Sequence, residues 1–173
     1  MAYTPSFIYS SGGNAIFSNI PIGGVAYASL GTDTTDVNGQ FWITDLYVPY
    51  AKWVTTVGYL QGTGPGTDNF LAAIWDSTGA LVRTTALAGV ANSGASTFKE
   101  QAWLTPVQRY GPAQYFVAIQ GNGTTAASIK TIAASTYLNV VSTVLGGAFG
   151  TVPATITVPT TFVALNAPIV YVK

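Results

Sequence analysis

The sequence contains no cysteine and no histidine, and charged residues make up only 7% of its 173 positions, against about 25% in an ordinary soluble domain. Without histidine there is no imidazole base and no His-ligated metal. Without cysteine there is no thiol nucleophile, disulfide or zinc–thiolate site. The six basic and six acidic residues give a net charge of zero. Because the basic residues are scattered along the chain, no stripe can neutralise several phosphates, which argues against nucleic-acid binding.

Neutral polar residues take the place of charged residues in making the surface polar, since threonine alone supplies 24 positions. From Thr131 to Val172 the chain carries no charge at all. Prolines at 153, 159 and 168 interrupt this stretch, and it contains no apolar run of about 18 residues, so we predict no membrane span. The segment Met1–Pro5 lacks a basic region followed by an apolar one, which predicts synthesis in a cytoplasm without a signal peptide. A surface of neutral polar residues suits a protein that packs against copies of itself or against a partner.

β-branched and aromatic residues dominate, turn formers recur at short intervals, and no stretch has the apolar spacing of a surface helix. The pattern predicts an all-β fold, an antiparallel β-sandwich of the jelly-roll type with an apolar N-terminal arm. The expected strands cover residues 41–48, 53–60, 70–75, 81–85, 97–104, 114–120, 128–133, 155–158 and 163–172.

Local signals define the turns and faces of several strands. Residues 71–82 read as a hairpin, in which Asp76 starts the turn and Gly79 takes a positive φ. Residues 121–123 form a second turn, and alternation over 114–120 sets Tyr115, Val117 and Ile119 against Phe116 and Ala118. The glycine-rich stretch 62–67 has no following lysine or helix, so we interpret it as a wide hairpin loop, not a phosphate loop.

The first 30 residues differ from the rest, because they are uncharged and rich in glycine and aromatic residues. We therefore divide the chain into an N-terminal arm, 1–30, and a β-sandwich, 31–173. An arm this apolar does not stay free in water. Either it covers its own sandwich or it lies on a neighbouring subunit. Its candidate residues for contact with another subunit or a partner are Phe7, Ile8, Tyr9, Ile16, Phe17 and Tyr27.

Two sets of side chains are candidate ligand sites. Trp42, Trp53 and Trp103 form a candidate glycan platform, although tryptophans in a sandwich usually fill the core or a subunit seam. Asp33 and Asp36 are a candidate calcium pair, but their spacing is not that of an EF-hand, and a turn at Asn38–Gly39 also accounts for them. We therefore expect no metal and no cofactor.

The acidic residues do not predict catalysis. Glycoside hydrolysis needs two carboxylates that flank the bond, but most acidic residues here stand beside Gly, Asn, Ser or Thr, where Asp is a turn former. A serine nucleophile would have no histidine partner, and no Ser-x-x-Lys pattern replaces one. We expect a protein that is not an enzyme.

An ordered set of turn-and-strand motifs resembles a jelly-roll domain of virion proteins of tailed bacteriophages. The motifs cover residues 39–49 (GQFWITDLYVP), 57–62 (VGYLQG), 66–68 (GTD), 73–81 (AIWDSTGAL), 88–89 (AG) and 111–124 (GPAQYFVAIQGNGT). The resemblance implies a head decoration (cement) protein or a fibre-type domain, often trimeric, and carries over no catalytic residues. Residues 1–30 lie outside it.

The resulting expectation is a capsid decoration protein on the exterior of a virion. Its partners would be copies of itself, as a homotrimer, and the major capsid protein. A receptor- or glycan-binding module of a tail or head fibre is the alternative, and a cellular carbohydrate-binding or adhesion domain is a third. A cement protein gains from an uncharged exterior because no ion has to be stripped of water at the contact.

Overall fold

A computed structural model describes residues 7–11, 14–64, 66–92, 96–105, 108–134 and 140–173. Every pair of neighbouring strands runs antiparallel. A single turn of 3-10 helix, η1 (Tyr27–Ser29), interrupts the strands. The strands are β1 (Phe7–Ser11), β2 (Asn14–Ser18), β3 (Thr32–Thr35), β4 (Phe41–Val48), β5 (Lys52–Val54), β6 (Thr56–Leu60), β7 (Asn69–Asp76), β8 (Leu81–Thr84), β9 (Val90–Ala91), β10 (Phe98–Ala102), β11 (Gln108–Tyr110), β12 (Ala113–Gly121), β13 (Ser128–Thr131), β14 (Ser142–Leu145) and β15 (Val170–Val172).

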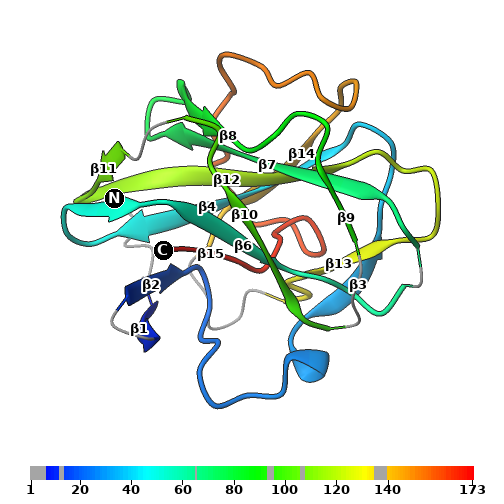
Figure 1. Cartoon of the computed structure of the whole chain (residues 1–173), viewed down its shortest axis with the longest axis horizontal. Coiled ribbons are helices and arrows are strands. Elements are labelled where there is room, and N and C mark those ends of the chain that lie inside the picture. Colours follow the sequence, from blue (N-terminus) through cyan, green and yellow to red (C-terminus); the bar gives the residue numbers. More distant parts are fainter. Residues whose placement is uncertain (1–6, 12–13, 65, 93–95, 106–107, 135–139) are drawn as a thin grey trace.

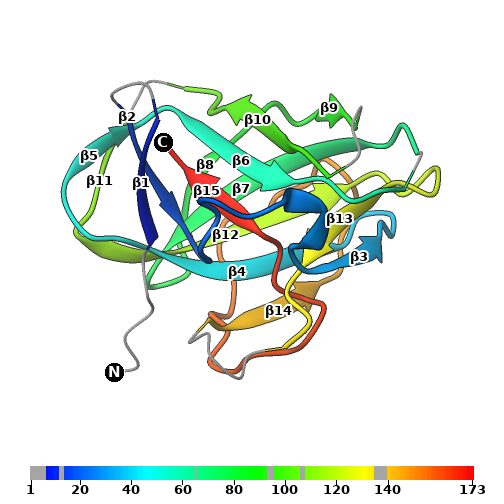
Figure 2. The same cartoon turned by 90° about the horizontal axis from the view of Figure 1, so that it is seen from below.

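The strands form two larger sheets and two ribbons. The first sheet has the order β1-β2-β15-β6-β10, and the second has β14-β4-β12-β7-β8, with β9 also paired to β7. The ribbons β5–β11 and β3–β13 lie at opposite ends of the molecule (Figures 1 and 2). The predicted all-β class with antiparallel sheets is confirmed, and the arrangement is consistent with a sandwich.

The central core lies between the two sheets. Val57, Tyr59 and Val172 from the first sheet share one buried cluster with Val117 and Ile119 from the second. All five are fully buried. The alternation predicted for residues 114–120 is confirmed, because Phe116 and Ala118 belong to another cluster, on the outer face of the second sheet.

The outer faces of both sheets are also covered by the chain. Over the second sheet, residues 146–163, here called the cover segment, pack Phe149, Val152, Ile156 and Val158 against the outer cluster. In Figure 1 this orange part of the chain runs along the top of the molecule, next to β8. The outer face of the first sheet packs mainly against residues that flank β2, β13 and β15. Because the second sheet is apolar on both faces, its central strands read as nearly continuous hydrophobic runs.

Some of the expected elements are wrong. Residues 53–60 form two strands rather than one, because the backbone N–H groups of Thr55 and Thr56 both donate to Lys173 O, and β5 then leaves the sheet that β6 joins. Residues 62–67 are not a hairpin loop, since β6 and β7 belong to different sheets. Residues 155–158 form only an isolated bridge, Ala80 to Thr155, and of 163–172 only β15 is a strand. β1, β2, β3, β9, β11 and β14 were not foreseen.

Within the described residues, no helix is long and apolar enough to cross a membrane.

Candidate functional site

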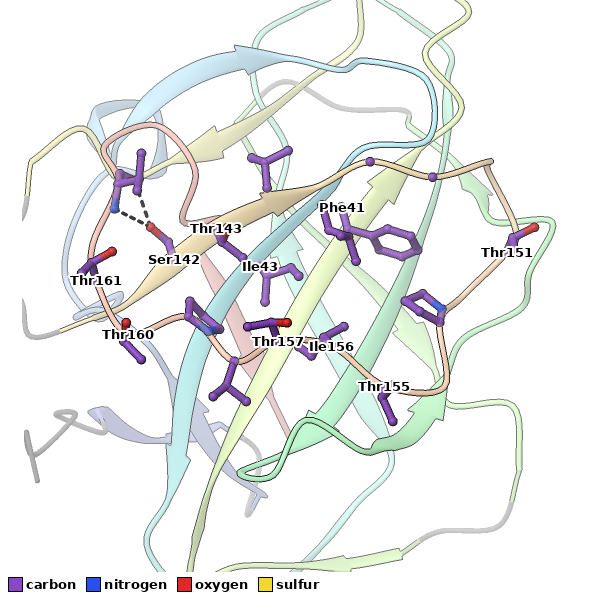
Figure 3. A pocket seen from close by; sticks show the side chains of 18 of the residues that line it. Phe41, Ile43, Ser142, Thr143, Thr151, Thr155, Ile156, Thr157, Thr160 and Thr161 are labelled. Carbon is purple, nitrogen blue, oxygen red and sulfur yellow. Dashed lines mark hydrogen bonds between the residues drawn. The ribbon is translucent and has the colours of Figure 1, made fainter.

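A cavity of about 700 Å³ lies between the outer face of the second sheet and the cover segment (Figure 3). Its floor includes Phe41 and Ile43 of β4, and β14 forms one wall. The hydroxyls of Thr151, Thr155 and Thr157 come from the cover segment opposite. The cavity is therefore apolar at its base and hydroxyl-bearing along its rim.

The cover segment stays irregular because it contains Pro153 and Pro159, which cannot donate ladder hydrogen bonds. It is held to the sheet by a few specific contacts. Ile156 N–H donates to Gly79 O at 2.9 Å, Leu81 N–H donates to Ala154 O at 2.8 Å, and Trp75 Nε1 donates to Pro153 O at 3.0 Å. These bonds place the segment beside β7 and β8 and leave the cavity nearer β14.

The chemistry of the cavity is that of a neutral surface. None of its described lining residues is an acid, lysine or arginine, and their polar atoms are backbone groups and the hydroxyls of Ser142 and six threonines. Ser142 Oγ accepts from Val163 N–H and donates to Val163 O, both at 2.9 Å. This lining can bind a neutral group or a partner's side chain, but it contains no general acid or base.

The N-terminal contact candidates fall into two groups. Phe17 is fully buried in the central core, and Ile16 packs against the outer cluster of the first sheet. Ile8 is 50% exposed and Tyr27 is 39% exposed, and Phe7 is half-buried. The side chain of Tyr9 lies outside the described residues.

Of the two alternatives for the arm, its described part covers the chain's own sandwich. β2 pairs with β15, Asn19 Nδ2 donates to Pro168 O at 2.8 Å, and Asn19 Oδ1 accepts from Val170 N–H at 3.0 Å. The first sheet therefore contains strands from both sides of residue 30.

The structure does not bring the three candidate platform tryptophans together on the surface. Trp42 is 2% exposed and Trp103 is 8% exposed, and both belong to the central core cluster. A ring buried there cannot offer its face to a sugar. Trp53 is 60% exposed, on β5 opposite Arg109 of β11. The fourth tryptophan, Trp75, is fully buried.

Asp33 and Asp36 have separate surroundings. Asp33 Oδ1 forms an ion pair with Lys130 Nζ at 2.9 Å, and Thr63 donates to Asp33 through both its N–H and its hydroxyl. Burial raises the pKa of Asp33, but these partners outweigh it and the pKa lies below the ordinary value. Asp36 is 5% exposed and accepts from Gly123 N–H at 2.7 Å.

Asp36 has a neighbour that the sequence did not suggest, the fully buried Asp68. Burial raises the pKa of Asp36 to about 6, and the charge of Asp68 contributes to this rise against the opposing hydrogen bond from Gly123. In the sequence, Asp68 reads as a turn former after Gly66 and Thr67. Its burial depends on contacts with residues more than 50 positions away.

Comparison with known proteins gives no relative from which a role could be carried over. No protein-family model, no curated protein and no solved structure matches this chain.

Proposed function

We propose that the protein is a non-enzymatic structural protein of a tailed-phage virion, a capsid decoration (cement) protein with a jelly-roll fold. The observation that carries the proposal is the neutral cover segment. It presents the exposed threonines 151, 155, 157, 160 and 161 around an apolar cavity, inside a stretch of chain without a single charge.

The strand order supports the jelly roll. In a jelly roll, eight strands labelled B to I in chain order form two sheets with the neighbours B-I-D-G and C-H-E-F. The eight strands in question would be β2, β4, β6, β7, β8, β10, β12 and β15. With that assignment, β2-β15-β6-β10 has the order B-I-D-G and β4-β12-β7-β8 has the order C-H-E-F. β1 and β14 then extend the two sheets at one edge each.

A neutral surface is suited to assembly. Covering hydroxyls and methyl groups does not strip water from an ion, so the desolvation penalty is small. Among the described residues, twelve large apolar side chains, Ile8, Tyr27, Trp53 and Leu104 among them, are exposed as well and would gain from burial. Symmetry repeats each weak contact, and effective concentration multiplies the result. We propose a homotrimer bound to the major capsid protein on the head exterior.

Sedimentation tests both parts of this proposal. Analytical ultracentrifugation of the full chain should give a species of three 18.0 kDa subunits. Heads that lack the protein, from the phage that encodes it, should pellet with the added chain, and density for it should appear on the head exterior. Heads that leave the chain in the supernatant would overturn the capsid role.

The exposed residues Ile8 and Tyr27 offer a finer test of the N-terminal contact. Deletion of residues 1–30 would also remove β2, so single substitutions are preferable. Ile8→Asp and Tyr27→Asp should each weaken head binding at least tenfold, because each puts a charge into the proposed contact. Ala102→Asp, on the exposed edge of β10, is the matched control. Equal binding by all three variants would refute the N-terminal contact.

Trp53 favours a second candidate function, the binding of a glycan by a fibre module. Its indole is exposed opposite Arg109, an arrangement that can stack on a sugar ring and donate to its hydroxyls. A glycan array with the full chain tests this function. Binding that Trp53→Ala abolishes would favour it, and an array without signal would discard it.

A further inference from the structure

Two buried carboxylates are held by one loop at the end of the sandwich opposite β5 and β11. Asp36 follows β3, Asp68 precedes β7, and the loop after β12 reaches both. Gly123 N–H donates to Asp36 Oδ2 at 2.7 Å, while the N–H groups of Thr124 and Thr125 donate to Asp68 Oδ1, each at 2.8 Å. Thr124 Oγ1 adds a further bond to Asp68 Oδ1 at 2.6 Å. Consecutive residues of one loop thus orient both carboxylates.

The second oxygen of each carboxylate has no such partner. Asp36 Oδ1 and Asp68 Oδ2 are buried without a hydrogen-bond partner among the described residues. Tyr59 is a fully buried neighbour whose pKa is raised by burial and by the charge of Asp36, against the opposing effect of the Gln101 and Gln61 side chains. Gln101 Nε2 donates to Phe70 O at 2.8 Å, and the Gln101 side chain lies beside the Tyr59 hydroxyl. One buried oxygen of each aspartate is therefore left without a donor among the described residues.

Within the described part of the chain, no basic side chain balances the two carboxylates. Burial raises the pKa of Asp68, but the bonds from Thr124 and Thr125 outweigh it and the pKa lies below its ordinary value. Asp68 is therefore ionised at neutral pH. The charged group that acts on Asp36 is this same Asp68, which repels it. Lys130, a buried lysine, is already paired with Asp33.

We propose that Asp36 and Asp68 bind one divalent cation of the calcium type through Asp36 Oδ1 and Asp68 Oδ2. A divalent cation balances two carboxylates. Calcium takes carboxylate, amide and water oxygens in irregular geometry, whereas magnesium requires a near-octahedral set. The hydrogen bond on the other oxygen of each carboxylate is the support that metal-binding carboxylates receive in proteins.

The absence of a side chain at Gly121 lets the Asp36 carboxylate lie close to the backbone of β12. A Cβ added to Gly121 would lie 1.9 Å from Asp36 Oδ2, so a larger residue there would displace the carboxylate. No group of three or more acidic, His or Cys side chains able to hold a metal occurs among the described residues, so neutral oxygens and water complete the coordination. Asp33 does not take part, because Lys130 and Thr63 occupy its carboxylate.

Thermal unfolding and terbium luminescence of the full chain test the site directly. At a calcium concentration 100 times the dissociation constant, Tm should rise by about 5 to 10 °C over its value in EDTA. Terbium should give emission on excitation of the aromatic rings, because Tyr59 lies beside the site, and calcium should displace it. A chain whose Tm does not respond to 5 mM calcium and which gives no terbium emission would overturn the proposal.

Substitution locates the site. Asp36→Asn keeps the shape of the side chain and removes one charge, so it should lower terbium emission at least tenfold and abolish the Tm response. In EDTA its Tm should equal or exceed that of the unsubstituted chain, because the repulsion from Asp68 is gone. Asp76→Asn, in the turn at the other end of β7, is the matched control and should keep the full response. A calcium response that survives Asp36→Asn would overturn the assignment, as would one lost equally in Asp76→Asn.

Discussion

At the residue scale, Asp36 should make the stability of the protein depend on pH. Its pKa is raised from 3.8 to about 6, first by burial and then by Asp68. A raised pKa in the folded state means that protonation favours folding, so this contribution is fully present below pH 3.8 and is lost as the pH rises through 6. Between pH 4 and 7, in EDTA, we expect the free energy of unfolding to fall by up to about 3 kcal/mol relative to Asp36→Asn. Urea unfolding at each pH measures it.

Calcium should reverse this dependence if it binds at Asp36, because the bound cation requires both carboxylates ionised. The pKa values of four other carboxyl groups are lowered in the folded state, those of Asp33, Asp68, Asp76 and Glu100. The stability that these groups contribute is lost only as the pH falls below about 4.5, so they do not affect the comparison at higher pH. A stability difference between the chain and Asp36→Asn that is flat from pH 4 to 7 would contradict the raised pKa.

Single residues show where the sequence was informative about the site. It singled out Asp36 because two carboxylates, Asp33 and Asp36, and the amide of Asn38 fall in one short stretch. It paired Asp36 with Asp33, which is near in the chain, whereas the structure brings in Asp68 through a loop after β12. Periodicity describes one strand at a time, so it cannot say which loops meet at the end of a sandwich.

At the element scale, local chemistry predicts the turn between β7 and β8 correctly. In the hairpin over 71–82, Asp76 Oδ1 accepts from the N–H groups of Thr78 and Ala80, and Gly79 has φ +86°, as expected. The sequence predicts strands in part of the cover segment because its threonines and valines are typical strand residues. Its prolines and its position outside the sheet prevent regular pairing.

Gly79 links the hairpin to the cover segment, so Gly79→Ala should destabilise both. The backbone there is left-handed, and a Cβ would lie 2.3 Å from Ile156 O. We expect a loss of at least about 2 kcal/mol in urea unfolding and faster proteolysis within residues 146–163. Gly146→Ala is the control, since nothing lies within 4 Å of its added Cβ. Equal effects of the two changes would show that the hairpin does not hold the segment.

β2 is the element through which the N-terminal residues stabilise the sandwich. Phe17 is fully buried and meets the Tyr50 ring edge-on at 5.2 Å between centroids. Phe17→Ala should therefore lower the free energy of unfolding by about 3 to 5 kcal/mol. Ile8→Ala, at a half-exposed position of β1, should change it by no more than about 0.5 kcal/mol. A mild effect of Phe17→Ala would mean that the first sheet tolerates the loss of β2.

At the scale of the whole molecule, the chain has few charges and its second sheet is packed on both faces. The second sheet buries apolar side chains on both faces, and the cover segment that closes its outer face carries only neutral residues. The exposed surface is therefore left with hydroxyls, amides and scattered apolar groups. Of the six basic residues of the chain, Lys130 forms an ion pair with Asp33 and Lys173 forms one with Glu100.

This surface predicts that association is insensitive to salt. Ion pairs between exposed charges weaken as the Debye length falls from about 10 Å at 0.1 M salt to about 3 Å at 1 M. Contacts made by threonine hydroxyls and apolar side chains lack that dependence, and burial of apolar groups does not weaken as salt is added. We expect the dissociation constant for self-association, or for binding to heads, to change by less than about twofold between 50 and 500 mM sodium chloride at constant pH. Sedimentation across a salt series measures it, with calcium held constant so that Asp36 and Asp68 do not contribute. A tenfold weakening would mean that the few charges, rather than the neutral cover segment, carry the contact.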